Sequence, residues 1–252
     1  KMSHVEQSVL DDIVKALEGK YGKHAPLTVN RGLKHDYLGM NIDYSQPGKV
    51  TFDMHEYVKG LLHEAPDELL KARAATPAAN HLFEINARAT KLSEEKAEIF
   101  HHLVAKLLYL CKRTRPDIIL PVAFLCTRVQ NPDEDDFKKL GRCLSYLQNY
   151  PDIPLTLEAS KDGVIKWWVD ASFAVHSDYK SHTGACMSLG KGCPINISSK
   201  QKINTRSSTE AELVGVNDVL ALILWVRHFL EAQGFTITDN VVYQDNMSSI
   251  LL

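Results

Sequence analysis

The sequence has little that marks a secreted, disulfide-bonded or membrane-spanning protein. Its five cysteines are an odd number and include no Cys-x-x-Cys pair, so a disulfide framework or zinc site is not expected and a reducing, intracellular setting fits best. The longest apolar runs, Ile118–Cys126 and Val219–Val226, are far shorter than the roughly 20 residues that span a bilayer. The chain does not open with a basic segment followed by an apolar one, so we expect neither a secretion signal nor a membrane partner.

Histidine metal motifs and a strong net charge are also missing. The eleven histidines include no His-Glu-x-x-His, and the adjacent His101 and His102 would lie roughly 100° apart on a helix, which suits no single metal ion. The formal net charge of −2 neither requires nor excludes nucleic acid, because the distribution of charge decides that question. With 44% hydrophobic and 24% charged residues, the chain can form a globular protein with a sizeable core.

The first part of the chain is predicted to contain a helix and then a hairpin. Ser3 and Glu6 form a Ser-x-x-Glu capping box ahead of apolar residues at helical spacing, which end at Gly22. Two strand-like segments follow, Tyr37–Tyr44 and Lys49–Met54. The connection between them has four residues and contains Pro and Gly, which is typical of a hairpin.

Helical spacing dominates the next hundred residues. We expect helices at His55–Leu62, from a cap at Ser93 to about Lys112, and from Pro116 onward. Asn131 and Pro132 predict the N-cap and first residue of a further helix. The acidic run Asp133–Asp136 could bind a cation, but we favour the interpretation that it offsets the macrodipole of that helix.

A change of pattern indicates a domain boundary between residues 149 and 163, where the chain has two prolines and no helical stripe. We place one domain at residues 1–155 and a second at residues 160–252. In the second we expect strands at Val164–Ala171, Thr183–Leu189 and Ile195–Ser199, a turn at Gly190–Gly192, a long helix at Thr209–Gln233 and a strand at Val241–Gln244. This order predicts an α/β fold with a mixed sheet and a crossover helix.

We expect the first and last strands of the second part to pair side by side and parallel, which would bring acidic residues together. Asp170 and Asp245 end the first and last strands of the second part, and Glu210 and Glu212 lie near the start of the helix between them. Neighbouring carboxylates repel one another unless a cation joins them, so three convergent ones predict a site for Mg²⁺, with Mn²⁺ as an alternative. Two such ions about 4 Å apart could hold the attacking water and the leaving oxygen of phosphodiester hydrolysis. The plainer alternative is that an aspartate after a strand belongs to a turn.

Three segments around these residues resemble the ribonuclease H of copia-type long-terminal-repeat retrotransposons. They are Trp168–Ser172, Ser207–Leu213 and Tyr243–Asn246, and the Ser-Ser-Thr-Glu-Ala-Glu stretch is the most specific. Residues 182–184 and 197–201 stand where that family has related segments. Upstream, residues 109–117 resemble the family's segment between polymerase and ribonuclease H, and residues 37–40 its strand pair after the polymerase active site.

The resemblance implies a fold and a function for both parts. Residues 1–155 would be a reverse transcriptase tail with a palm remnant, a primer-handling hairpin and a helical thumb or connection, and residues 160–252 a ribonuclease H-like domain. Asp170, Glu212 and Asp245 would be the catalytic metal ligands, and the partners would be an RNA/DNA hybrid and the remainder of the polyprotein. Glu210 and Glu212 lie roughly 200° apart on a helix, so only one can serve the site. The family's ligand glutamate precedes an apolar residue, which favours Glu212.

The sequence also departs from the family. The polymerase aspartates would lie just before Lys1, and a further strand, a helix and a fourth acidic residue would follow Leu252. We therefore expect the sequence to be truncated at both ends. We expect no polymerase activity and little or no cleavage from residues 1–252 alone. The alternatives are a catalytically inactive nucleic-acid-binding remnant and a decayed element without function.

A basic segment gives a candidate nucleic-acid contact. Five Lys and Arg residues and no acidic residue occur between Lys180 and Arg206, so the segment is either a solvated face or a stripe that tracks phosphates. The candidate contacts are Lys200, Lys202, Arg206, Ser207 and Ser208, the two serines being placed to reach the backbone and a 2′-hydroxyl. We expect Trp167, Trp168 and Trp225 to lie in the core rather than to stack on bases.

Overall fold

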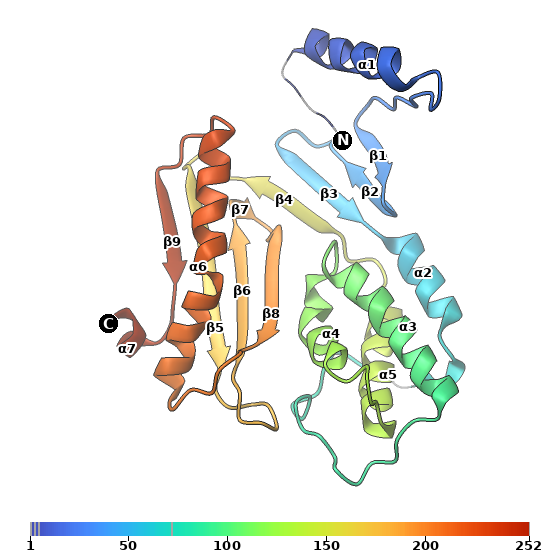
Figure 1. Cartoon of the computed structure of the whole chain (residues 1–252), viewed down its shortest axis with the longest axis vertical. Helices are drawn as coiled ribbons and strands as arrows, with labels where there is room; N and C mark the ends of the chain where they lie inside the picture. Colours follow the sequence, from blue (N-terminus) through green and yellow to red (C-terminus); the bar gives the residue numbers. More distant parts are fainter. Residues whose placement is uncertain (1, 3, 5, 72, 252) are drawn as a thin grey trace. The chain divides into compact units, whose positions relative to one another are not determined.

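The computed structural model describes residues 2, 4, 6–71 and 73–251, and the chain divides into two units, residues 1–35 and 36–252 (Figure 1). The first unit contains α1 (Gln7–Tyr21). Gly22 ends this helix as predicted, and its N–H donates to the carbonyl of Glu18. Ser3 of the expected capping box lies outside the described residues, and the N-cap position is held by Glu6, which makes no capping hydrogen bond with its side chain.

The first sheet is formed by strands from distant parts of the sequence. Its order is β1-β2-β3-β4-β7, with β1 (Lys34–Tyr37), β2 (Met40–Asp43), β3 (Lys49–Asp53), β4 (Leu155–Ala159) and β7 (Gly190–Lys191). The β2–β3 hairpin is as predicted, but the continuous strand expected at residues 37–44 is wrong. Leu38 and Gly39 both have positive φ angles, 52° and 74°, which is the backbone of a tight turn between two strands.

β4 lies in the segment at which the sequence indicates a domain boundary. It pairs antiparallel with β3, and the hydroxyls of Thr51 and Thr156 lie 3.2 Å apart across the pair. Its other edge pairs with β7, so the turn expected at Gly190–Gly192 contains a short strand instead. The first sheet therefore takes strands from both sides of residues 155–160, because a strand partner need not be near in sequence.

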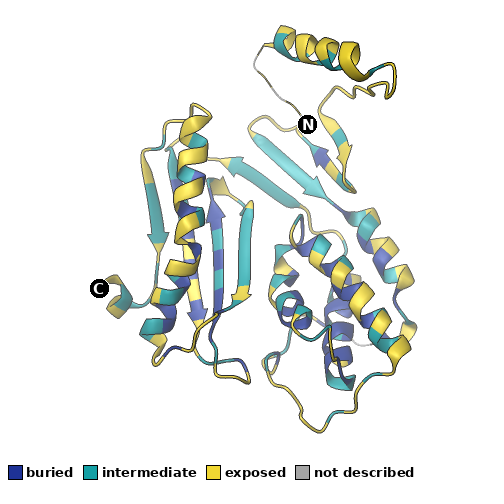
Figure 2. Cartoon of the chain, in the orientation of Figure 1, coloured by how far each residue is buried: buried dark blue, intermediate teal, exposed yellow. Residues whose placement is uncertain are grey.

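Helices fill the chain between β3 and β4. They are α2 (His55–Glu64), the 3₁₀ turns η1 (Asp67–Leu69) and η2 (Pro116–Ile118), α3 (Glu94–Cys111), α4 (Ile119–Cys126) and α5 (Glu134–Asn149). Their apolar stripes meet in one core, in which Phe100, Leu107, Leu140 and Leu144 are fully buried (Figure 2). The predicted cap at Ser93 is confirmed, since its side chain accepts a hydrogen bond from the N–H of Lys96.

The start of α5 differs from the prediction. The N-cap is Asp133 rather than Asn131, and its carboxylate accepts from the N–H groups of Asp135 and Asp136. Asp136 in turn accepts from the N–H of Asp133, which completes a capping box. Both of these carboxylates are buried and pair with the guanidinium of Arg128. The nearby guanidinium favours this later start, because it satisfies two carboxylates that are buried.

The second sheet has the order β8-β6-β5-β9 and carries one helix on its face. Its strands are β5 (Val164–Ser172), β6 (His182–Ser188), β8 (Ile195–Lys200) and β9 (Asp239–Tyr243), followed by α7 (Met247–Ile250). The β5–β9 pair is parallel and the other two pairs are antiparallel, so the sheet is mixed. α6 (Ser208–Ala232) connects β8 to β9 as the expected crossover helix. The predicted α/β class is confirmed.

α6 contacts the sheet with one side only. Val219, Ile223 and Val226 form a core with Trp167 of β5, whereas the opposite side of the helix is largely exposed (Figure 2). By length and composition α6 is apolar enough to cross a membrane. The buried stripe shows how this helix packs on the sheet. The expectation that the tryptophans are core residues holds for Trp167 alone, because Trp168 and Trp225 are 42% and 57% exposed.

Candidate active site

The two aspartates lie beyond the end of the parallel strand pair. The last residues paired between β5 and β9 are Trp168 and Tyr243, and Asp170 and Asp245 follow each of these by two positions. The predicted parallel, side-by-side arrangement of these strands is therefore confirmed. Because carboxyl ends of parallel strands meet at the same edge, both carboxylates lie at one end of the second sheet.

Glu212 reaches this end of the sheet from the start of α6. The helix begins after Ser207, whose hydroxyl accepts a hydrogen bond from the N–H of Glu210. The carboxylate of Glu210 turns back to accept from the N–H of Arg206. Glu212, further along the helix, is only 5% exposed and points toward the sheet. The structure thus brings Glu212 to the aspartates and holds Glu210 at the cap.

Both oxygens of Glu212 accept hydrogen bonds. Its Oε1 accepts from the N–H of Ala171 at 3.2 Å, and its Oε2 accepts from Nε2 of Gln244 at 2.9 Å. The N–H of Ala171 is available because β9 ends before this point of β5. These contacts fix the orientation of the carboxylate, as partners of metal-ligating groups commonly do.

The three carboxylates form a compact cluster. One oxygen each from Asp170, Glu212 and Asp245 lies within 4.8 Å of the others, closer than the roughly 8 Å beyond which a metal pair could not be shared. Burial raises the pKa of the Glu212 carboxyl, the hydrogen bonds from Gln244 and Ala171 lower it, and the charges of the two aspartates raise it further. Oxygen donors with this mutual repulsion suit a hard divalent cation such as Mg²⁺ or Mn²⁺.

Two glutamines position this cluster and were missed in the sequence. Gln244 links Glu212 to β9, and its Oε1 accepts from the N–H of Asn246. The buried Gln201 donates from Nε2 to the hydroxyl of Thr183 and to the carbonyl of Ala211, so it ties the end of β8 to the start of α6. Both stand inside the segments that carry the family resemblance, which was the signal that could have identified them.

The predicted nucleic-acid contacts do not form one uniform stripe. Lys200 makes an ion pair of 2.8 Å with Asp178, which reduces its effective charge. Lys202 and Arg206 are exposed, and in the described part of the chain their side chains make no ion pair. Ser207 is the N-cap of α6 and Ser208 is the first helical residue. Both serines are exposed and follow Arg206 directly in the sequence.

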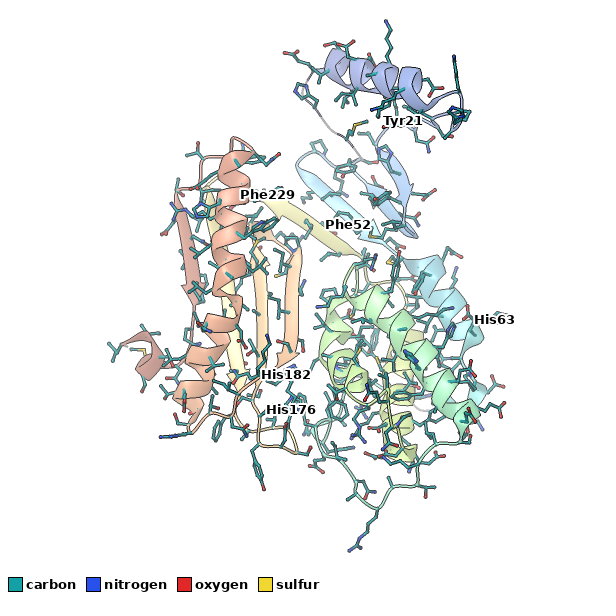
Figure 3. The ribbon with its side chains drawn as sticks, in the orientation of Figure 1. Tyr21, Phe52, His63, His176, His182 and Phe229 are labelled. Atoms are coloured by element: carbon teal, nitrogen blue, oxygen red, sulfur yellow. The ribbon has the colours of Figure 1, made fainter. Side chains whose placement is uncertain are left out.

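A buried histidine pair lies near the same end of the sheet. Nε2 of His176 and Nδ1 of His182 are 3.1 Å apart, and Nε2 of His182 lies 2.7 Å from the hydroxyl of Ser198 (Figure 3). Phe83, from the segment between η1 and α3, contacts both imidazole rings. Burial lowers the pKa of His182 to about 4, and His176 beside it lowers it as well. Sequence spacing indicated no role for either residue.

The chain is similar to proteins encoded by retrotransposons. It is 27% identical over 244 residues to the retrovirus-related Pol polyprotein from transposon TNT 1-94 of Nicotiana tabacum, covering 94% of this chain and 18% of the relative. It is 31% identical over 222 residues to that from transposon RE2 of Arabidopsis thaliana, covering 86% of this chain and 15% of the relative. A putative transposon Ty5-1 protein of Saccharomyces cerevisiae is 27% identical over 188 residues, covering 73% of this chain and 59% of the relative.

These relatives agree with the family that the sequence segments resemble. The chain spans less than a fifth of the length of the two plant polyproteins. No protein-family model matches the chain. No solved structure matches it either. The matches to the two polyproteins cover most of this chain. The chain therefore belongs with the retrovirus-related Pol polyproteins of copia-type transposons, of which it corresponds to one segment.

Proposed function

We propose that residues from about 160 onward act as a ribonuclease H, hydrolysing the RNA strand of RNA/DNA hybrids with the help of divalent metal ions. The single observation that carries this proposal is the cluster of Asp170, Glu212 and Asp245, whose oxygens lie within 4.8 Å at the end of the parallel pair β5–β9. Residues 1–155 would be the tail of the reverse transcriptase, and the remainder of the Pol polyprotein its partner inside the cell. The Pol relatives support both assignments.

The residues of the cluster fit a magnesium or manganese ion. Asp170, Glu212 and Asp245 would hold it, with Glu212 already oriented by Ala171 and Gln244. Bound Mg²⁺ would supply positive charge that stabilises the negative charge developing on the phosphate. Asp170 and Asp245 are exposed, so the side of the cluster away from α6 is open to a phosphodiester. Lys202 and Arg206 would contact phosphates of the hybrid, and Ser207 and Ser208 its sugars.

The test compares two glutamates in a polyprotein segment that carries residues 1–252 within their natural flanks. Glu212→Gln should abolish Mg²⁺-dependent cleavage of a labelled RNA/DNA hybrid, because it removes a ligand charge. Glu210→Gln is the matched control and should retain most of the activity, since Glu210 is held at the N–H of Arg206. Equal losses from the two changes, with folding intact, would contradict the assignment. Hybrid binding without any cleavage by the unchanged protein would favour the inactive, nucleic-acid-binding alternative.

A further inference from the structure

The face of the second sheet opposite α6 presents its side chains in rows. Trp167 and Val169 point to the core beneath α6, so their neighbours Trp168 and Asp170 belong to the outer face. Strand register aligns Trp168 with Tyr243 on one side and Cys186 on the other. The next row contains Asp170, Gly184 and Ser198, the last one aligned through β6. The carboxylate cluster is thus one end of a row that crosses the outer face.

Two aromatic rings stand beside that end of the row. Trp168 and Tyr243 are stacked, with ring centroids 5.2 Å apart and an angle of 16° between their planes. They are 42% and 44% exposed, although both lie on strands. They line a cavity of about 530 Å³, to which Asp170 and Asp245 also contribute, and which extends to Ile119 of α4. This volume is within the range of small-ligand pockets.

The other end of the row lies beside two lysines. Ile119 also lines a second cavity of about 270 Å³. Its lining is mainly apolar, and its polar residues are Lys112, Lys200, Thr127, Ser198, Ser199 and the two buried histidines. No carboxylate contributes to the lining of this second cavity. Lys112 is exposed and makes no ion pair in the described residues, whereas Lys200 is paired with Asp178. Ile119 therefore contributes both to the cavity that contains the two aspartates and to the cavity that contains Lys112.

We propose that an unpaired stretch of a nucleic-acid strand crosses this outer face, with a base against the Trp168–Tyr243 pair and its next phosphates toward Ser198 and Lys112. Aromatic side chains beside a basic groove are the usual means of binding single strands, because every base offers a ring face and every nucleotide a charge. A base inside a duplex has both faces covered by its neighbours, so only an unpaired base can stack on Trp168. The inference rests on the proposed function, since the strand concerned is the one whose phosphate lies at Asp170 and Asp245.

Gly184 lies in the row between Asp170 and Ser198 and allows a test that leaves both ends of the row intact. A Cβ added there would have the carbonyl oxygen of Asp170, at 3.9 Å, as its nearest neighbour, which is an ordinary van der Waals contact. Valine is favoured in strands and would stand between Asp170 and Ser198. Gly184→Val should therefore obstruct the bound nucleic-acid strand without removing an aromatic ring or a charge.

The experiment measures binding of the full chain to a fluorescently labelled single-stranded RNA of about eight nucleotides by anisotropy, in EDTA. Trp168→Leu and Tyr243→Leu should each raise Kd by about fivefold or more, with the salt dependence unchanged, because they remove stacking and no charge. Lys112→Ala should lower the slope of log K against log salt by about 0.7, the value for one phosphate contact of a single strand. Trp225→Leu and Lys161→Ala are the matched controls, since both residues are exposed and neither lines the two cavities.

The outcomes separate this inference from the proposed function. If Trp168→Leu and Gly184→Val bind as tightly as Trp225→Leu, no strand crosses the outer face. If Trp168→Leu fails to fold, as judged by circular dichroism, Gly184→Val and Tyr243→Leu still decide the question. Binding in EDTA needs no metal ion, so it is independent of the Glu212→Gln cleavage test. A hybrid with an unpaired overhang should also compete at least about fivefold better than the fully paired hybrid, and equal competition would overturn the proposal.

Discussion

The backbone N–H of Ala171 donates a hydrogen bond of 3.2 Å to Oε1 of Glu212. This contact ties α6 to a point of β5 that β9 does not reach, and it leaves the carboxylate facing Asp170 and Asp245. β5 continues past the last residue that pairs with β9, so the N–H of Ala171 can bind the carboxylate of Glu212. This contact adds Glu212 to the two aspartates and completes the acidic cluster. The following predictions concern that cluster and the structure around it.

Divalent metal ions should stabilise the folded chain through the cluster. At a Mg²⁺ concentration about a hundredfold above Kd, binding to the native state alone adds about 2.7 kcal/mol to the free energy of unfolding. Thermal denaturation with and without Mg²⁺ should show this as a rise in Tm. The rise should disappear in Asp170→Asn and Asp245→Asn and persist in the control Asp178→Asn. An equal rise in all variants would show that the ion binds elsewhere.

Without metal ions, the same Asp170→Asn change should stabilise the protein at neutral pH. Burial and the nearby aspartates raise the pKa of Glu212. A carboxyl with a raised folded pKa contributes stability that is fully present below its unfolded pKa and is lost as pH rises through the folded pKa. Neutralising Asp170 removes one of the repulsive charges. In EDTA, the Tm of the Asp170→Asn variant should exceed that of the unchanged protein at pH 7, and this difference in Tm should shrink toward pH 4. A gap that does not vary with pH would rule out this repulsion as the cause.

The buried histidine pair should make the fold sensitive to mild acid. Burial lowers the pKa of His182 to about 4, whereas an unfolded histidine titrates near 6.5. A base with a depressed folded pKa contributes stability above its unfolded pKa that is lost as pH falls through the folded value. The loss between about pH 6.5 and 4 should be roughly 3 kcal/mol. Urea unfolding should show this dependence and a weaker one in His182→Gln. Parallel pH profiles for the two proteins would contradict the prediction.

Phosphate contacts near the start of α6 should come mainly from two of the three predicted cations. Lys202→Ala with Arg206→Ala should lower the salt slope of hybrid binding by about 1.8, because each duplex phosphate contact contributes about 0.9. Lys200→Ala should change the slope less, since Asp178 already pairs with that ammonium group at 2.8 Å. Titrations at several salt concentrations measure the slope. An unchanged salt slope in the double variant would show that this segment is a solvated face that does not contact phosphates.

The corrected start of α5 predicts unequal effects of two neighbouring substitutions. Asp133→Ala should lower the free energy of unfolding by about 2 kcal/mol or more, because it removes the cap and leaves Arg128 without one of its two partners. Asn131→Ala should have an effect within about 0.5 kcal/mol, since Asn131 is exposed and is not the N-cap. Chemical denaturation compares the two variants. Similar losses from both variants would show that Asn131 also acts as a cap of α5.

Local patterns in the sequence determined most of the elements of the second part. Alternation identified β5, helical spacing identified α6, and the order of strands and helix predicted the parallel pair that brings Asp170 and Asp245 together. The choice of Glu212 over Glu210 needed only helix geometry and the family resemblance. The cap at Ser93 likewise depends on residues within one turn. Such features are predictable because their causes lie within a few residues along the chain.

Only the tertiary structure decided features whose partners are distant in sequence. β4 is a strand because β3, more than a hundred residues earlier, pairs with it, and Asp133 replaces Asn131 as cap in a contact with Arg128. Trp168 is exposed although it sits in a strand like Trp167, because only one face of the second sheet is covered by α6. The bond from Gln244 to Glu212 and the contact of Phe83 with the two histidines join segments that no short-range pattern relates. Hydrogen bonding and burial depend on which segments meet in space, and a single sequence does not show that directly.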